Sequence, residues 1–155
     1  MFSFSILRIY CSEKMNFSIF GAPKNSYVNF EIVQCAIRKE EEYILINTLP
    51  LTDQDCLISG TTDAFQEETI LNEILSNYKV PDKKIIVYGK NNEDISVYRK
   101  TTQLHTLGVK DVHIYLGGMF EWMLLQDVYG KQNFPTTKNI IDILRYKSAK
   151  ALVKN

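Results

Sequence analysis

The stretch that decides the fold runs from residue 85 to residue 118 and reads IIVYGKNNEDISVYRKTTQLHTLGVKDVHIYLGG. It contains two short apolar runs, 85–88 and 112–115, separated by a polar loop and by a segment with apolar residues at helical spacing. Short apolar runs of this kind are typical of strands buried on both faces, and a helix between two such strands is typical of a parallel sheet. The stretch therefore predicts a strand, a helix and a second strand in one βαβ unit.

The same alternation of apolar runs and helical periodicity continues on both sides of this unit. Gly108 follows one helical segment as a residue that commonly ends helices, and Asp63 precedes another as an N-cap. We therefore expect an α/β fold, with a parallel sheet of four or five strands and helices on both faces. The predicted strands are 43–46, 57–58, 85–88 and 112–115, and the predicted helices are 27–39, 65–78, 95–107, 120–129 and 139–146, the last with Thr137 as its cap.

Length and composition indicate one globular domain. The chain has 155 residues, of which 45% are apolar, and 18 basic residues balance 18 acidic ones. A net charge of zero argues against nucleic-acid binding, and no apolar run approaches the roughly 18 residues of a membrane span. We divide the chain into an N-terminal segment (1–24) with an edge strand near its start, a domain (25–130) and a C-terminal extension with a short helix (131–155).

The cysteines and histidines do not form a pattern that binds metal. Cys11, Cys35 and Cys56 are widely spaced without a C-x-x-C pair, and His105 and His113 lie far from them in the sequence. A structural zinc site needs about four such ligands in close groups. We therefore expect no metal and no cofactor, and a reduced, cytoplasmic protein.

One signature resembles a known family. The residues around Gly117, Gly118 and Trp122 resemble the Leu-x-Gly-Gly-x-x-x-Trp signature of the rhodanese-like (sulfurtransferase) family. The stretch that contains Gly108 is similar to the family's segment before that signature, and the similarity extends over about 27–122. The C-terminal segment looks most like that of small rhodanese-like proteins from large DNA viruses, algae and protists.

The resemblance implies a catalytic cysteine that carries sulfur as a persulfide, directly after the strand 85–88. Glycine stands at that position here, and the family's Asp-Val-Arg after an earlier strand is replaced by Asn47-Thr48-Leu49. A glycine cannot hold a persulfide. We expect Asn92 to cap the next helix, with two acids in its first turn. The degenerate active loop consists of Gly89, Lys90, Asn91, Asn92, Glu93 and Asp94.

These departures predict a catalytically inactive domain that serves in protein interaction or assembly, virion-associated if the protein is viral. One alternative is a sulfurtransferase or phosphatase-like enzyme with Cys56 as a relocated nucleophile, although the neighbouring acids raise a thiol pKa. Another is a sensor that binds a small anion at the degenerate loop. A protein partner is expected, and the candidate contact residues are Phe120, Tyr129, Phe134 and Tyr146. The extension either packs against the domain itself or contacts that partner.

Overall fold

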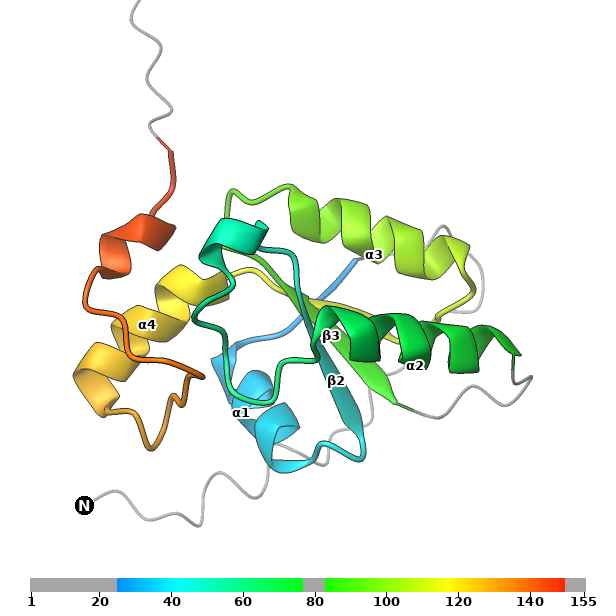
Figure 1. The fold of residues 1–155 in the computed structure, drawn as a ribbon, viewed down its shortest axis with the longest axis horizontal. Coiled ribbons are helices and arrows are strands. Elements are labelled where there is room, and N and C mark those ends of the chain that lie inside the picture. Colours follow the sequence, from blue (N-terminus) through cyan, green and yellow to red (C-terminus); the bar gives the residue numbers. More distant parts are fainter. Residues whose placement is uncertain (1–24, 77–82, 150–155) are drawn as a thin grey trace, which may run out of the picture.

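The computed structural model describes residues 25–76 and 83–149, and these form a parallel sheet covered by helices (Figure 1). The strand order is β1-β4-β3-β2, and every pairing is parallel. This confirms the predicted α/β class. The elements are β1 (Ser26–Tyr27), α1 (Phe30–Arg38), β2 (Tyr43–Asn47), the 3-10 helix η3 (Leu51–Asp53), α2 (Ala64–Ser76), β3 (Lys84–Tyr88), α3 (Ser96–Thr106), β4 (Val112–Tyr115), α4 (Gly118–Tyr129) and the 3-10 helix η4 (Ile143–Tyr146).

Side chains that alternate along the strands divide the core into two layers. Along β2, Tyr43 and Leu45 join a cluster with α1 and α4, whereas Ile44 and Ile46 join a second cluster with α2 and α3. Because successive side chains of a strand point to opposite faces, one run of apolar residues supplies both layers. In Figure 1, α1 and α4 accordingly lie on one side of the sheet and α2 and α3 on the other.

The first helix starts later than its sequence pattern predicted. Ser26 and Tyr27 pair with β4 as an edge strand, and α1 begins only at Phe30. The Asn29 side chain accepts a hydrogen bond of 3.2 Å from the amide of Ile32, which caps the helix. The predicted strand within residues 1–24 lies outside the described residues.

The predicted helix 139–146 is wrong in length and type, because only the 3-10 turn η4 forms there. The chain before it bends and is not helical, and Thr136 forms an antiparallel bridge with Ile58. Thr137 accepts a hydrogen bond from the amide of Leu57 with its hydroxyl instead of capping a helix. Residues 57–58 thus form a bridge to the C-terminal segment and not a strand of the main sheet.

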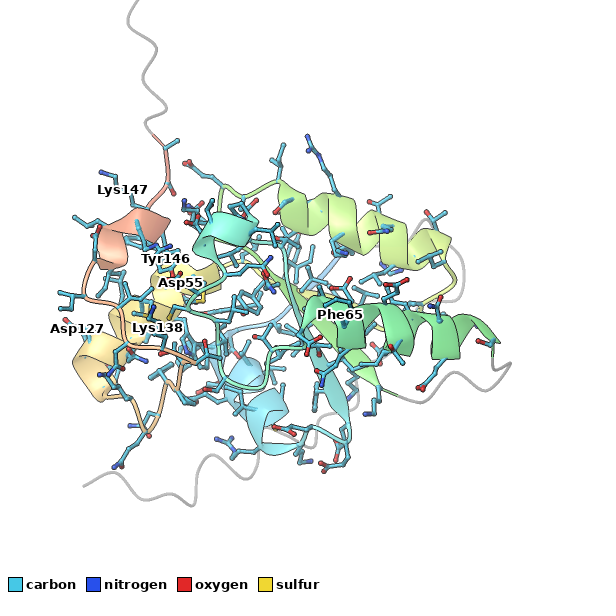
Figure 2. All side chains as sticks on the ribbon, viewed as in Figure 1. Asp55, Phe65, Asp127, Lys138, Tyr146 and Lys147 are labelled. Carbon is cyan, nitrogen blue, oxygen red and sulfur yellow. The ribbon has the colours of Figure 1, made fainter. Side chains whose placement is uncertain are left out.

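Residues 131–149, called the C-terminal segment below, complete the core. Phe134 and Tyr146 are both buried and belong to the layer formed with α1 and α4. The Phe134 ring lies 5.0 Å from that of Trp122, edge to face, and the Trp122 indole donates a hydrogen bond to the carbonyl of Pro135. Figure 2 shows Tyr146 close to the labelled Asp55 and Lys138, where this segment packs beside α4. The described part of the extension, residues 131–149, therefore packs within the domain.

Candidate functional site

The degenerate loop, residues 89–94, lies between β3 and α3 at the edge of the sheet where the strands end. Ligand sites of open parallel sheets lie at this edge. The start of α4 supports the loop, because the amides of Met119 and Phe120 donate hydrogen bonds of 3.0 Å to the carbonyls of Gly89 and Lys90. Gly118 has a φ of +58°, and a Cβ there would lie 2.5 Å from the Gly89 carbonyl oxygen. The Gly-Gly turn thus allows α4 to approach the loop.

The carboxylate of Asp94 fills the interior of the loop. One oxygen accepts a hydrogen bond of 2.8 Å from the amide of Lys90, and the other accepts hydrogen bonds from the amide and hydroxyl of Ser96, at 3.0 and 2.6 Å. These are the kinds of donors that bind an anion at the start of a helix. The loop therefore carries its own anion.

The predicted cap at Asn92 is wrong. The helix begins at Ser96, so Glu93 and Asp94 precede it and do not lie in its first turn. Asp94 accepts from the Ser96 amide, and Asn91 accepts a hydrogen bond of 3.0 Å from the amide of Glu93. Asn92 and Glu93 thus form a turn that places the carboxylate of Asp94 ahead of the helix.

Gly89 is packed so closely that a side chain at this position requires rearrangement. A Cβ on Gly89 would lie 2.5 Å from the carboxylate oxygen of Asp94 and 2.9 Å from a methyl group of Val97. Both distances are shorter than real Cβ contacts. The site where the family resemblance places a nucleophile is therefore occupied by the side chains of the following residues.

An ion-pair network lies beside the loop. Asp53 binds Lys90 at 3.0 Å and Arg145 at 3.1 Å, and Arg145 also lies 3.1 Å from Asp55. Burial alone would raise the pKa of Asp53, but hydrogen bonds and charge from Lys90 and Arg145 outweigh it and lower that pKa. The only loop cation is thereby neutralised, and η3, the loop and η4 are held together.

The C-terminal segment also contacts the loop directly. The Asn91 side chain donates a hydrogen bond of 2.8 Å to the carbonyl of Tyr146, and Ser148 donates one of 3.2 Å to the side chain of Asn92. Asn91 is itself buried. The segment therefore covers part of the loop.

Cys56 does not have the surroundings of a nucleophile. Its side chain is fully buried, and its thiol donates a hydrogen bond of 3.1 Å to the carbonyl of Lys138. Burial raises the pKa of this thiol, and the charge of Asp55 acts in the same direction. The neutral thiol is the stable form.

The aromatic residues predicted to contact a partner divide into two groups. Phe134 and Tyr146 are buried in the chain's own core, so they are not available to a partner in this structure. Phe120 is half-buried against the same core, whereas Tyr129 is 62% exposed at the end of α4. The signature residue Trp122 is fully buried and packs against Phe134.

Sequence reasoning missed the roles of Asp53 and Arg145. They lie 92 residues apart in the chain and meet only because the C-terminal segment returns to η3. Neither stands in a motif, so a single sequence carries no signal for their pairing. For Asp94, the sequence signal was present in the acidic pair, but the pair was assigned to the first turn of the helix instead of to the loop amides.

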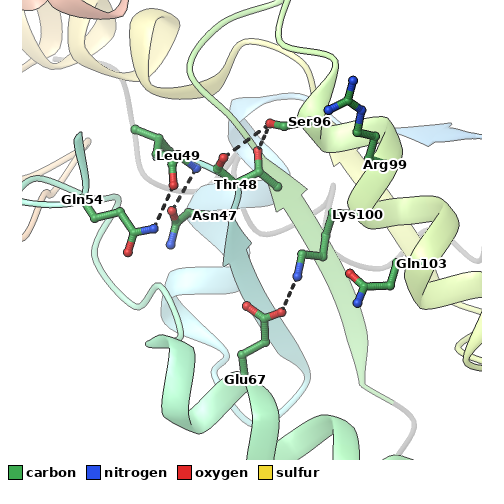
Figure 3. A pocket seen from close by; sticks show the side chains of 9 residues that line it. All are labelled: Asn47, Thr48, Leu49, Gln54, Glu67, Ser96, Arg99, Lys100 and Gln103. Carbon is green, nitrogen blue, oxygen red and sulfur yellow. Dashed lines mark hydrogen bonds and ion pairs between the residues drawn. The ribbon is translucent and has the colours of Figure 1, made fainter. Parts of the chain in front are cut away.

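Beside the loop, a polar cleft of about 400 Å³ opens between the ends of β2 and β3 and the starts of α2 and α3 (Figure 3). It is lined by Asn47, Thr48, Leu49, Gln54, Glu67, Ser96, Arg99, Lys100 and Gln103.

Within residues 25–76 and 83–149, no group of histidine, cysteine or acidic side chains could hold a metal ion. No helix in this part of the chain is long and apolar enough to cross a membrane.

Comparison with known proteins confirms the resemblance. The sequence profile of the rhodanese-like domain matches residues 37–125. Among solved structures, a full-length protein from Lactobacillus plantarum has a TM-score of 0.53 at 15% identity, covering 73% of this chain and 88% of that one. A protein from Bacillus halodurans has a TM-score of 0.50 at 17% identity, covering 68% and 74%. At such identities the likeness concerns the fold alone. No curated protein matches the chain.

Proposed function

Because the chain belongs to the rhodanese-like domain family, we propose that it is a member without sulfurtransferase activity that acts by binding another protein. The observation that carries the proposal is the Asp94 carboxylate inside the degenerate loop. It takes the hydrogen bonds of the Lys90 and Ser96 amides, which in an active loop would stabilise a charged sulfur. With Gly89 at the nucleophile position, the loop lacks the thiol, and its Lys90 amide already donates to Asp94.

The enzymatic alternative has less support. Sulfur transfer through a persulfide needs an accessible thiolate, because the thiolate is the attacking species. The Cys56 thiol is buried, donates a hydrogen bond to a carbonyl and has a raised pKa. The alternative of an anion sensor at the loop meets the same obstacle as catalysis, because Asp94 already binds the amides and Lys90 is paired with Asp53.

The interaction half of the proposal is supported by exposed apolar side chains. On α4, Leu124 and Val128 lie one helical turn apart, and Tyr129 follows; all three are exposed. In the C-terminal segment, Ile141 and Leu144 are exposed as well. Large apolar side chains of this kind are common anchors of protein interfaces. A cytoplasmic location and a viral or protist origin belong to the same proposal.

A thiosulfate-to-cyanide transfer assay tests the loss of activity. The wild-type chain and Gly89→Cys are both expected to show no turnover, because the new thiol would lie against the Asp94 carboxylate. The double variant Gly89→Cys/Asp94→Ser removes that charge and is expected to form a more reactive thiol. Thr102→Cys, on the exposed side of α3, controls for any surface cysteine. Wild-type turnover that disappears in Cys56→Ser would contradict the proposal.

Quantitative affinity capture from cells of the source organism tests the interaction. The variant Leu124→Asp/Val128→Asp is expected to lose a specific partner that the wild-type chain retains. Phe65→Asp is the control, because Phe65 is also a large, exposed apolar side chain but lies on α2 (Figure 2). Equal capture by all three proteins would show that this face of α4 does not bind the partner.

A further inference from the structure

The polar cleft at the ends of β2 and β3 is separate from the interior of the degenerate loop. Its walls are the start of α2, which contributes Glu67, and the first turns of α3, which contribute Arg99, Lys100 and Gln103. Asn47, the last residue of β2, lies between them (Figure 3). Its volume is about 400 Å³, it is open to solvent, and its lining residues are polar except for Leu49. A cleft of this chemistry suits a compact, polar ligand.

The charges that line the cleft leave one cation without a carboxylate. Lys100 is 2.7 Å from Glu67, and this ion pair bridges α3 and α2 across the cleft. Arg99 precedes Lys100 on α3 and also lines the cleft. It is exposed and forms no ion pair with any residue in the described part of the chain. Two cations and one carboxylate give the lining a net charge of about +1, and a guanidinium is suited to binding two oxygens of one anion.

Neutral hydrogen-bond donors also line the cleft. The Asn47 carbonyl oxygen accepts a hydrogen bond from the amide of Leu49, which leaves its NH2 group without a partner among the described residues. The Gln103 side chain, likewise, makes no hydrogen bond within residues 25–76 and 83–149. By contrast, Gln54 donates to the carbonyl of Leu49, and the Ser96 hydroxyl is taken up by Thr48 and Asp94. The unused groups of the cleft are thus amides and a guanidinium.

We propose that this cleft binds a small metabolite through an oxyanion group, a phosphate or a carboxylate, with Arg99 as its charged ligand. The Asn47 and Gln103 side-chain amides donate hydrogen bonds to the oxyanion or to other polar groups of the bound metabolite. The Lys100–Glu67 pair bridges the two walls, and its carboxylate keeps the lining from having a larger positive charge. The site does not depend on the loop 89–94, so it stands or falls independently of the loss of sulfurtransferase activity.

Titrations followed by two-dimensional NMR or calorimetry test the site. The probes are inorganic phosphate and acetate, each compared with chloride at equal ionic strength, so that the two arms distinguish a phosphate from a carboxylate preference. At least one probe is expected to bind saturably. Arg99→Gln is expected to weaken that binding about tenfold or more, as removal of a charge-assisted bidentate contact does.

Two further variants separate the cleft from general charge effects. Arg38→Gln makes the same change at an exposed arginine on α1, across the sheet from the cleft, and is expected to leave affinity unchanged within about twofold. Glu67→Gln removes the lining carboxylate and frees Lys100, so the anion is expected to bind more tightly. The proposal is overturned by the absence of saturable binding, by equal effects of Arg99→Gln and Arg38→Gln, or by weaker binding in Glu67→Gln.

Discussion

The side chain of Asn91 donates a hydrogen bond of 2.8 Å to the main-chain carbonyl of Tyr146, 55 residues further along the chain. This bond joins the degenerate loop to η4, and Tyr146 itself is fully buried in the core. The loop and the C-terminal segment therefore form one structural unit. The predictions below follow from this unit and from the contacts around it.

Replacing Tyr146 tests whether the C-terminal segment stabilises the domain. Tyr146→Ala is expected to lower the free energy of unfolding by about 3–5 kcal/mol, as loss of a large buried aromatic side chain does. Tyr146→Phe is expected to change it little or to raise it, because the buried hydroxyl has no hydrogen-bond partner among the described residues. The measurement is urea unfolding followed by circular dichroism. The exposed Leu144→Ala is the control, with a change within about 0.5 kcal/mol.

Two glycines with positive φ offer a matched test of the approach of α4 to the loop. At Gly118 a Cβ would meet the Gly89 carbonyl at 2.5 Å, whereas at Gly130, with a φ of +88°, nothing lies within 4 Å. Gly130→Ala is expected to cost about 1 kcal/mol for the backbone conformation alone. Gly118→Ala adds a steric clash of about 1–3 kcal/mol. Equal unfolding midpoints for the two variants would show that the turn and the loop are not in tight contact.

The ion pairs of Asp53 predict a dependence of stability on acid. The pKa of Asp53 is lowered in the folded protein from its ordinary value of 3.8. Its contribution is therefore present above about pH 4 and is lost as the pH falls through the lowered folded pKa. In urea unfolding at pH 5 and pH 3, Asp53→Asn is expected to lose less stability on acidification than the wild-type chain. Asp142→Asn, at an exposed carboxylate, is expected to follow the wild-type curve.

Cys56 is expected to resist alkylation in the folded protein. Its thiol is buried and its pKa is raised by that burial, so little thiolate is exposed to reagent at pH 8. Peptide mass spectrometry after iodoacetamide treatment measures labelling at this residue specifically. Labelling is expected to be complete in urea and slow without it. Rapid labelling of the native chain would revive the enzyme hypothesis.

The sequence predicted the parts of the fold that depend on local periodicity. The strands 43–46, 85–88 and 112–115 were identified because buried parallel strands are short continuous apolar runs. The cap at Asp63 was predicted correctly as well, because its side chain accepts a hydrogen bond of 2.8 Å from the amide of Gln66. Gly108, with a φ of +94°, ends α3 as expected.

The parts that could not be predicted depend on contacts between distant segments. Ile140, Ile143 and Leu144 have helical spacing, but the chain bends after the bridge between Thr136 and Ile58 and forms only a 3-10 turn there. The charge of Asp94 was visible in the sequence, whereas its hydrogen bond to the Lys90 amide depends on the path of the loop. Local patterns thus indicate elements, and the tertiary fold decides how polar side chains are used.

The short segment at Thr61 has a consequence for solubility. β2 lies at one end of the sheet, and a long apolar edge strand is a template for pairing with other chains. Here Leu45 forms a parallel bridge with Thr61, and its carbonyl accepts a hydrogen bond of 2.8 Å from the amide of Thr62. The Tyr88 hydroxyl, 2.7 Å from that of Thr61, anchors this segment from the core. The segment thus covers the middle of β2 and is expected to limit aggregation through this edge strand.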